Sequence, residues 1–105
     1  MSRLFLGVDG GQSGTTALIG DETGRVLGMG SAGPCNHVRS GDGREKFVRA
    51  VTDCVEAAFR KAGIEGGGVR FAAACLGFSG GPDDKRELVE EIVAAERLIV
   101  TTDAW

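Results

Sequence analysis

The sequence predicts an α/β fold, in which helices pack on a mixed five-stranded sheet and the elements follow the order β-β-β-α-β-α-β. Two observations lead to this prediction. The first part of the chain holds three short apolar segments separated by brief turns, which is typical of an antiparallel meander. The rest of the chain alternates helical and strand-like hydrophobic periods, which is typical of strands joined by helical crossovers.

The first three strands are expected at residues 3–9, 15–21 and 24–32. The segment RLFLGVD at 3–9 is typical of a buried strand, and TTALIGD and GRVLGMGSA follow it. The turn between the second and third strands is the Asp-Glu-Thr-Gly sequence at 21–24, whose residue types favour a tight turn. Short connections of this kind favour antiparallel pairing between successive strands.

The hydrophobic period changes to that of an amphipathic helix after Asp42 and ends before Gly63. Asp42, with Glu45 three residues later, resembles a capping box, and glycine is common just after a helix. The apolar positions of the predicted helix are Phe47, Val51, Cys54, Val55, Ala58, Phe59 and Ala62.

The second half of the chain predicts two more strands separated by a second helix. The near-continuous apolar run at 69–78 is expected to be a central strand covered on both faces. Residues 79–96 begin with turn and acidic residues and place Leu88, Val89, Ile92 and Val93 on one helical face. Residues 97–103 (RLIVTTD) are expected to form the last buried strand.

Composition indicates one ordinary globular domain. The chain has 105 residues, 42% hydrophobic and 26% charged, with a net charge of −3. Its basic residues are dispersed and its apolar runs are short, so we expect neither nucleic acid nor membrane as a partner. Three cysteines without a C-x-x-C spacing indicate reduced thiols in a cytoplasmic protein. The chain ends two residues after the last strand, so we expect it to be the front part of a larger protein.

The segment GVDGGQSGTT at residues 7–16 is open to two interpretations. Glycines let backbone N–H groups approach a phosphate, and the hydroxyls of Ser13, Thr15 and Thr16 can donate hydrogen bonds to it. Asp9 is able to hold Mg²⁺ through waters. Alternatively, the segment is only a hairpin turn, in which the glycines provide positive φ and Asp9 caps the turn.

The segment GMGSAG at residues 28–33 matches the letters of a dinucleotide-binding fingerprint. That fingerprint works only where its glycines open a helix that receives the pyrophosphate. Here no helical period begins before about Asp42, so the glycines are expected at the end of a strand.

The segments 5–38, 76–84 and 100–104 together resemble the N-terminal lobe of the BadF/BadG/BcrA/BcrD-type ATPase family, and within it the N-acetylglucosamine kinases. The family belongs to the actin, hexokinase and heat-shock ATPase superfamily, whose lobes are ribonuclease-H-like. The resemblance covers essentially the whole chain, in the same order and at similar spacing. It implies an ATP-dependent enzyme that uses Mg²⁺.

The resemblance implies that Asp9 helps to hold Mg²⁺ and that the loop after it faces the phosphates of ATP. The residues implied at the nucleotide are Gly10, Gly11, Gln12, Ser13, Gly14 and Thr15. Two of them depart from the family pattern. Gln12 stands where many relatives have a third glycine, and Gly14 stands where many have lysine or arginine.

The resemblance also implies a sugar cleft, in which Asp103 accepts the proton of the sugar hydroxyl. The other residues implied there are Asn36, His37, Ser79, Gly80 and Gly81. If the first, fourth and fifth strands run parallel, Asp9 and Asp103 emerge at the same edge of the sheet. Alternatively, His37 is a loop histidine, and Ser79 and Asp103 cap helices.

The expected function is that of the N-terminal part of an amino-sugar kinase, which transfers the γ-phosphoryl group of ATP to a sugar hydroxyl. Two alternatives stay open: an activator ATPase of a 2-hydroxyacyl-CoA dehydratase or benzoyl-CoA reductase system, and a non-catalytic binding lobe. The 105 residues alone are expected to be inactive, and a homodimer is compatible with the sequence.

Overall fold

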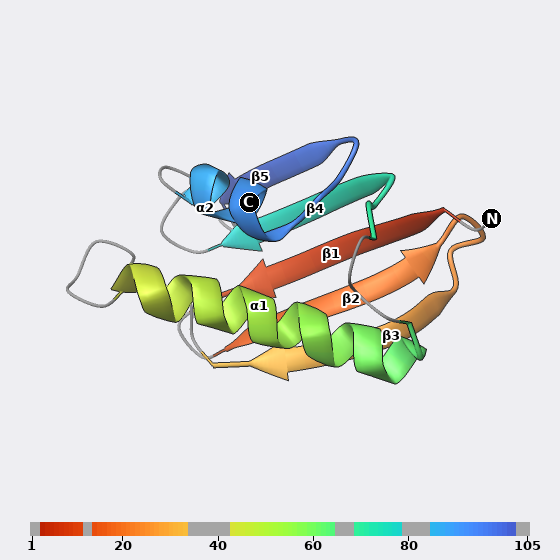
Figure 1. The fold of residues 1–105 in the computed structure, drawn as a ribbon, viewed down its shortest axis with the longest axis horizontal. Coiled ribbons are helices and arrows are strands. Elements are labelled where there is room, and N and C mark those ends of the chain that lie inside the picture. Colours follow the sequence, from red (N-terminus) through yellow and green to blue (C-terminus); the bar gives the residue numbers. More distant parts are fainter. Residues whose placement is uncertain (1–2, 12–13, 34–42, 65–68, 79–84, 103–105) are drawn as a thin grey trace.

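A computed structural model describes residues 3–11, 14–33, 43–64, 69–78 and 85–102 (Figure 1). Within these ranges it contains five strands and two helices, in the predicted order. Their bounds are β1 Leu4–Gly10, β2 Thr15–Asp21, β3 Val26–Ala32, α1 Gly43–Ala62, β4 Ala73–Phe78, α2 Lys85–Ile92 and β5 Leu98–Thr102.

The strands form one mixed sheet in the order β3-β2-β1-β4-β5. β2 pairs antiparallel with both β1 and β3, whereas β4 pairs parallel with both β1 and β5. The antiparallel pairs are joined by short turns and the parallel pairs by chain that includes a helix, as the sequence predicts. The mixed α/β fold is therefore confirmed.

Both helices lie on one face of the sheet, which we call the covered face (Figure 1). Side chains alternate between the two faces along a strand, so every second residue of a strand meets the helices. Phe47 of α1 packs edge-on against Phe78 of β4, with ring centroids 5.0 Å apart. The buried residues contributed to this core by the strands are Leu6, Val8, Ala17, Ile19, Ala74, Leu76 and Phe78.

The C-terminus of α1 has the capping geometry expected of a glycine stop. Gly63 has a φ of 73°, a left-handed conformation that favours glycine. Its N–H donates to the carbonyl of Arg60, and the N–H of Ile64 donates to the carbonyl of Phe59. This pair of bonds is a Schellman motif, which satisfies two carbonyls at the helix end.

The opposite face of the sheet, which we call the open face, carries neither of the described helices. Its members are Phe5, Gly7, Asp9, Thr16, Leu18, Gly20, Met29, Ser31, Ala73, Cys75, Gly77, Ile99 and Thr101. The prediction that the fourth strand is covered on both faces is wrong for the described part of the chain. Cys75 is exposed, while its neighbour Leu76 is fully buried.

The two largest differences from the predicted boundaries are at β4 and α2. β4 begins at Ala73, because Phe71 forms only an isolated parallel bridge to Ala95. α2 ends at Ile92, since Phe71 N–H donates to the carbonyl of Ala94 and Glu96 N–H donates to that of Phe71. With these bonds the backbone after α2 is paired with Phe71 and extended, and it leads directly to β5. None of the helices in the described ranges is both long and apolar enough to cross a membrane.

Candidate functional site

Asp9 lies at the C-terminal end of β1 and points to the open face. Its neighbours Val8 and Gly10 are buried on the covered face, so alternation along the strand directs the carboxylate to the other side. The side chain is exposed, and no other described residue hydrogen-bonds or ion-pairs with its carboxylate. Among the residues that the structure describes, none occupies the carboxylate oxygens of Asp9.

A row of small polar residues crosses the open face at the level of Asp9. Strand register places Thr16 beside Asp9 on one side and Gly77 on the other, and Ser31 and Thr101 follow on the outer strands. We call these five residues the polar row. Because Gly77 has no side chain, the row has a gap between the carboxylate of Asp9 and the side chain of Thr101.

The loop that follows Asp9 is a tight hairpin connection. Gly10 pairs with Thr15, and the N–H of Gly11 donates to the carbonyl of Gly14 at 3.0 Å. The backbone here is therefore a hairpin, but Gly10 and Gly11 are not among the glycines with positive φ, and no described residue hydrogen-bonds to Asp9 as a cap. A hairpin does not exclude a phosphate site at the same glycines. Gln12 and Ser13 lie outside the described residues.

Thr15 and Thr16 lie on opposite faces of β2. Thr15 is 1% exposed, and its hydroxyl donates to the carbonyl of Gly33 at 2.7 Å. Thr16 is half-buried in the polar row beside Asp9. Of these two hydroxyls, only that of Thr16 shares a face with Asp9. The hairpin pairs Asp9 with Thr16, and paired residues lie on the same face of a sheet. Because side chains alternate between faces along a strand, Thr15 must then lie on the opposite face.

The three parallel strands end together at the edge of the sheet next to the hairpin. Gly10 of β1 is in register with Phe78 of β4, and Phe78 is in register with Thr102 of β5. Chain that follows these positions therefore leaves the sheet at one edge. The other residues predicted for the sugar cleft lie outside the described residues; they are Asn36, His37, Ser79, Gly80, Gly81 and Asp103.

The site fits a magnesium ion held mainly through water. Within the described ranges, no group of three His, Cys, Asp or Glu side chains is arranged to hold a metal. Mg²⁺ commonly keeps several waters and takes one or two carboxylates, together with phosphate oxygens. A single exposed carboxylate bordered by Gly77 and Thr16 matches this mode, whereas the described residues alone do not supply enough ligands for a fully protein-ligated ion.

Two glycines of the 28–33 segment, Gly28 and Gly30, serve packing. A Cβ on Gly28 would lie 2.3 Å from the carbonyl oxygen of Ala58, and one on Gly30 would lie 2.3 Å from that of Cys54. Both glycines belong to β3, and they let α1 approach the strand closely. The prediction that this segment is not a dinucleotide fingerprint is supported, because Gly28 and Gly30 lie in a strand and serve the contact between helix and sheet.

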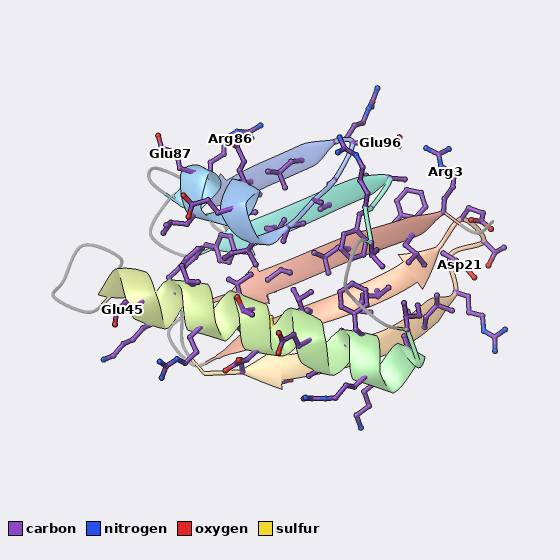
Figure 2. The ribbon with its side chains drawn as sticks, in the orientation of Figure 1. Arg3, Asp21, Glu45, Arg86, Glu87 and Glu96 are labelled. Carbon is purple, nitrogen blue, oxygen red and sulfur yellow. The ribbon has the colours of Figure 1, made fainter. Side chains whose placement is uncertain are left out.

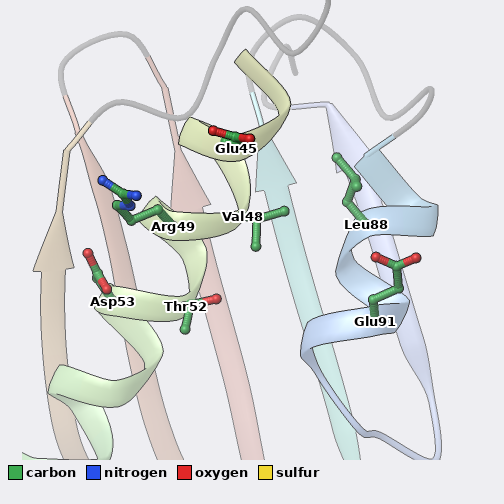
Figure 3. A pocket seen from close by; sticks show the side chains of 7 residues that line it. All are labelled: Glu45, Val48, Arg49, Thr52, Asp53, Leu88 and Glu91. Atoms are coloured by element: carbon green, nitrogen blue, oxygen red, sulfur yellow. The ribbon is translucent and has the colours of Figure 1, made fainter. Parts of the chain in front are cut away.

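A charged groove of about 640 Å³ lies between α1 and α2 on the covered side of the molecule (Figure 3). Its lining residues are Glu45, Val48, Arg49, Thr52, Asp53, Leu88 and Glu91. The sheet separates this groove from the open face, on which Asp9 lies. We therefore do not assign it to the candidate site.

Comparison with solved structures identifies two similar folds. A proposed N-acetylglucosamine kinase from Chromobacterium violaceum is 31% identical over 96% of this chain, with a TM-score of 0.73. Component A of the (R)-2-hydroxyglutaryl-CoA dehydratase of Acidaminococcus fermentans is 17% identical over 94% of this chain, with a TM-score of 0.52. No protein-family model matches the chain.

The chain spans about a third of both neighbours, 35% of the first and 31% of the second. At 17% identity the dehydratase component shares the fold alone. The first neighbour adds a sequence likeness over nearly the whole chain. The chain therefore has the fold of part of an N-acetylglucosamine kinase-like protein.

Proposed function

We propose that the chain is the nucleotide-binding front part of an ATP-dependent amino-sugar kinase of the BadF/BadG/BcrA/BcrD-type family. The observation that carries the proposal is the common edge at which β1, β4 and β5 end, with Gly10, Phe78 and Thr102 in register. Ligands of open α/β sheets bind at the carboxyl ends of parallel strands. The 31% identity to a proposed N-acetylglucosamine kinase supports the same conclusion.

In this proposal Asp9 binds waters of a magnesium ion at the end of β1. Bound Mg²⁺ would neutralise part of the negative charge on the phosphates of ATP. The glycines of the hairpin loop at 10–15 permit close approach of the phosphates to the backbone, although the N–H of Gly11 already donates to the carbonyl of Gly14. The hydroxyl of Thr16, which lies on the same face as Asp9, donates a hydrogen bond to a phosphate oxygen.

Asp103 is the proposed general base, and it directly follows the last residue of β5. It accepts the proton of the sugar hydroxyl as the oxygen of that hydroxyl attacks the γ-phosphorus. Asn36 and His37 orient the sugar from the segment before α1, and Ser79, Gly80 and Gly81 do so from the segment after β4. The chain corresponds to about a third of its neighbours, so the activity is proposed for a protein that carries this chain together with a second lobe.

A kinase assay on the longer protein tests the assignment of Asp103. We expect Asp103→Asn to lower kcat by about 10²–10⁴-fold, the usual contribution of a general base, with little change in the affinity for ATP. The substrates to compare are N-acetylglucosamine, N-acetylmannosamine, glucosamine and glucose. Unchanged turnover would remove the base assignment. ATP hydrolysis without phosphorylation of any sugar would favour the activator ATPase instead.

Calorimetric titration tests the role of Asp9. Asp9→Asn is expected to weaken binding of Mg-ATP more than binding of ATP without metal, because the carboxylate contacts the nucleotide through the ion. Asp53→Asn is the matched control, since Asp53 is an exposed aspartate on α1, away from the open face. An equal loss for both forms of ATP contradicts the metal role.

A further inference from the structure

Gly77 lies inside β4 without any of the usual structural reasons for a glycine in a strand. Its register with both neighbouring strands is uninterrupted, so it marks no β-bulge, and it is not among the described glycines with positive φ. Among the described atoms beyond its chain neighbours, a Cβ placed on Gly77 would meet only the methyl carbon of Thr101, at an ordinary contact distance of 3.8 Å. Glycine weakens a strand interior, and there it often marks a place where a ligand approaches closely.

Gly7 of β1 is the matching case on the same face. It also lies in uninterrupted register without positive φ, and no described atom beyond its chain neighbours lies within 4 Å of where its Cβ would stand. Across the sheet, however, Gly7 lies between Leu18 and Cys75. Gly77 instead lies beside the carboxylate of Asp9 in the polar row. The two glycines therefore leave similar room but border different chemistry.

We infer that the gap over Gly77 seats the water shell of the magnesium ion that Asp9 is proposed to hold, which makes Gly77 a specificity-determining residue. This inference rests on the proposed function. Asp9 and Thr101 stand two strand spacings apart, with about 10 Å between their backbones. A magnesium ion with a complete water shell is about 7 Å across, because each oxygen lies about 2.1 Å from the metal and each water adds a radius of about 1.4 Å. The shell therefore fits over Gly77, with Asp9 on one side and Thr101 on the other.

Substitution of Gly77 narrows this gap and leaves the fold intact. Side chains stand roughly perpendicular to a sheet, so a side chain at this position would project into the space between Asp9 and Thr101. Alanine adds one methyl group, whereas valine adds a larger, branched side chain of a type that is well suited to a strand. Because the described neighbours leave room for the Cβ, we expect both variants to fold. The loss of affinity for the hydrated ion should then rise with the volume of the side chain.

Calorimetric titration of the longer protein that carries this chain tests the inference. Gly77→Val is expected to weaken binding of Mg-ATP by about tenfold or more, and to change binding of metal-free ATP by less than about twofold, because it displaces ordered waters of the ion. Gly77→Ala should have a smaller effect in the same direction. Gly7→Ala and Gly7→Val are the matched controls and are expected to leave both affinities unchanged. Unchanged binding of Mg-ATP to Gly77→Val would overturn the inference. An equal loss for both forms of ATP would also overturn it, because the gap would then receive phosphate rather than the hydrated ion.

Cobalt(III) hexammine supplies a second readout, which requires neither nucleotide nor turnover. This complex resembles a fully hydrated magnesium ion in size and does not exchange its ligands, so it binds where an ion is held through its shell. In a nuclear magnetic resonance titration, we expect it to shift the amide signals of Asp9, Gly77 and Thr101, and we expect Gly77→Val to abolish these shifts. Shifts that persist in Gly77→Val, or their absence at Gly77 in the wild type, would overturn the inference. If the wild type shows the shifts but does not bind ATP, the proposed function fails while the cation seat at Gly77 stands.

Discussion

The two faces of the sheet are built from the same strands but differ in what they contact. On β4, Leu76 is fully buried beneath the helices, while the preceding residue, Cys75, is exposed on the open face. On β1, Val8 belongs to the core and Asp9 is exposed on the open face. Adjacent residues therefore serve separate purposes: one face stabilises the fold, and the other is available to a ligand or a partner.

The glycines show the same contrast. Gly30 on the covered face has no room for a side chain, since a Cβ there would lie 2.6 Å from that of Ala57. Gly7 on the open face has nothing within 4 Å of the equivalent position. Glycine on one face thus permits close packing of helix on strand, and on the other it leaves a hollow that faces solvent.

The largest expected effect comes from shortening a buried side chain of β4. Leu76→Ala should lower the free energy of unfolding by about 3 kcal/mol, because it removes buried surface and leaves a cavity under the helices. Cys75→Ala, one residue earlier on the open face, should change it by less than about 0.5 kcal/mol. Urea titration of both variants at low protein concentration measures the difference. Similar losses for the two variants would mean that the open face is also packed.

A smaller difference is expected between the two kinds of glycine. Gly30→Ala should cost about 2 kcal/mol, because the added methyl group forces α1 away from β3. Gly7→Ala should be neutral or stabilise the fold by about 0.5 kcal/mol, since alanine restricts the unfolded chain. Thermal unfolding of both variants provides the measurement. A destabilised Gly7→Ala variant would show that the hollow is filled in the folded chain.

The smallest effect concerns the β2–β3 turn, at the end of the sheet away from the candidate site (Figure 2). The side-chain hydrogen bond from Thr23, followed by backbone bonds from Thr23 and Arg25, lowers the pKa of Asp21 below its ordinary 3.8. Ionised Asp21 therefore stabilises the fold above pH 3.8, and this contribution is lost as pH falls through the lowered pKa. The stability difference between the wild type and Asp21→Ala should shrink over that range in acid denaturation experiments. A difference independent of pH would contradict the assignment.

Most of the fold follows from patterns in the sequence. Short turns between the first three segments indicate antiparallel pairing, and the helical period between later segments indicates parallel pairing. Gly63 marks the end of α1 because only a residue tolerant of positive φ continues the chain there. The end of α2 was less predictable, since hydrogen bonds between Phe71 and the chain after the helix stop it earlier than its hydrophobic period indicates.

The candidate site was predictable only in part. Asp9 and the glycine loop stand out by residue type, and their place at the end of β1 follows from the strand pattern. The choice between Thr15 and Thr16 required the faces of β2, because both residues carry the same hydroxyl. The contribution of Ser31 and Thr101 to the polar row depends on register between strands distant in sequence.

The sequence by itself determined which segments become strands and helices, because hydrophobic period, turn residues and helix ends are local properties. It also placed an acid at the end of the first strand. Only the tertiary structure decided which side of each strand meets the helices and which residues line up across the sheet. Those outcomes depend on both helices packing on the same side, so that Leu76 is buried and Asp9 is left in solvent.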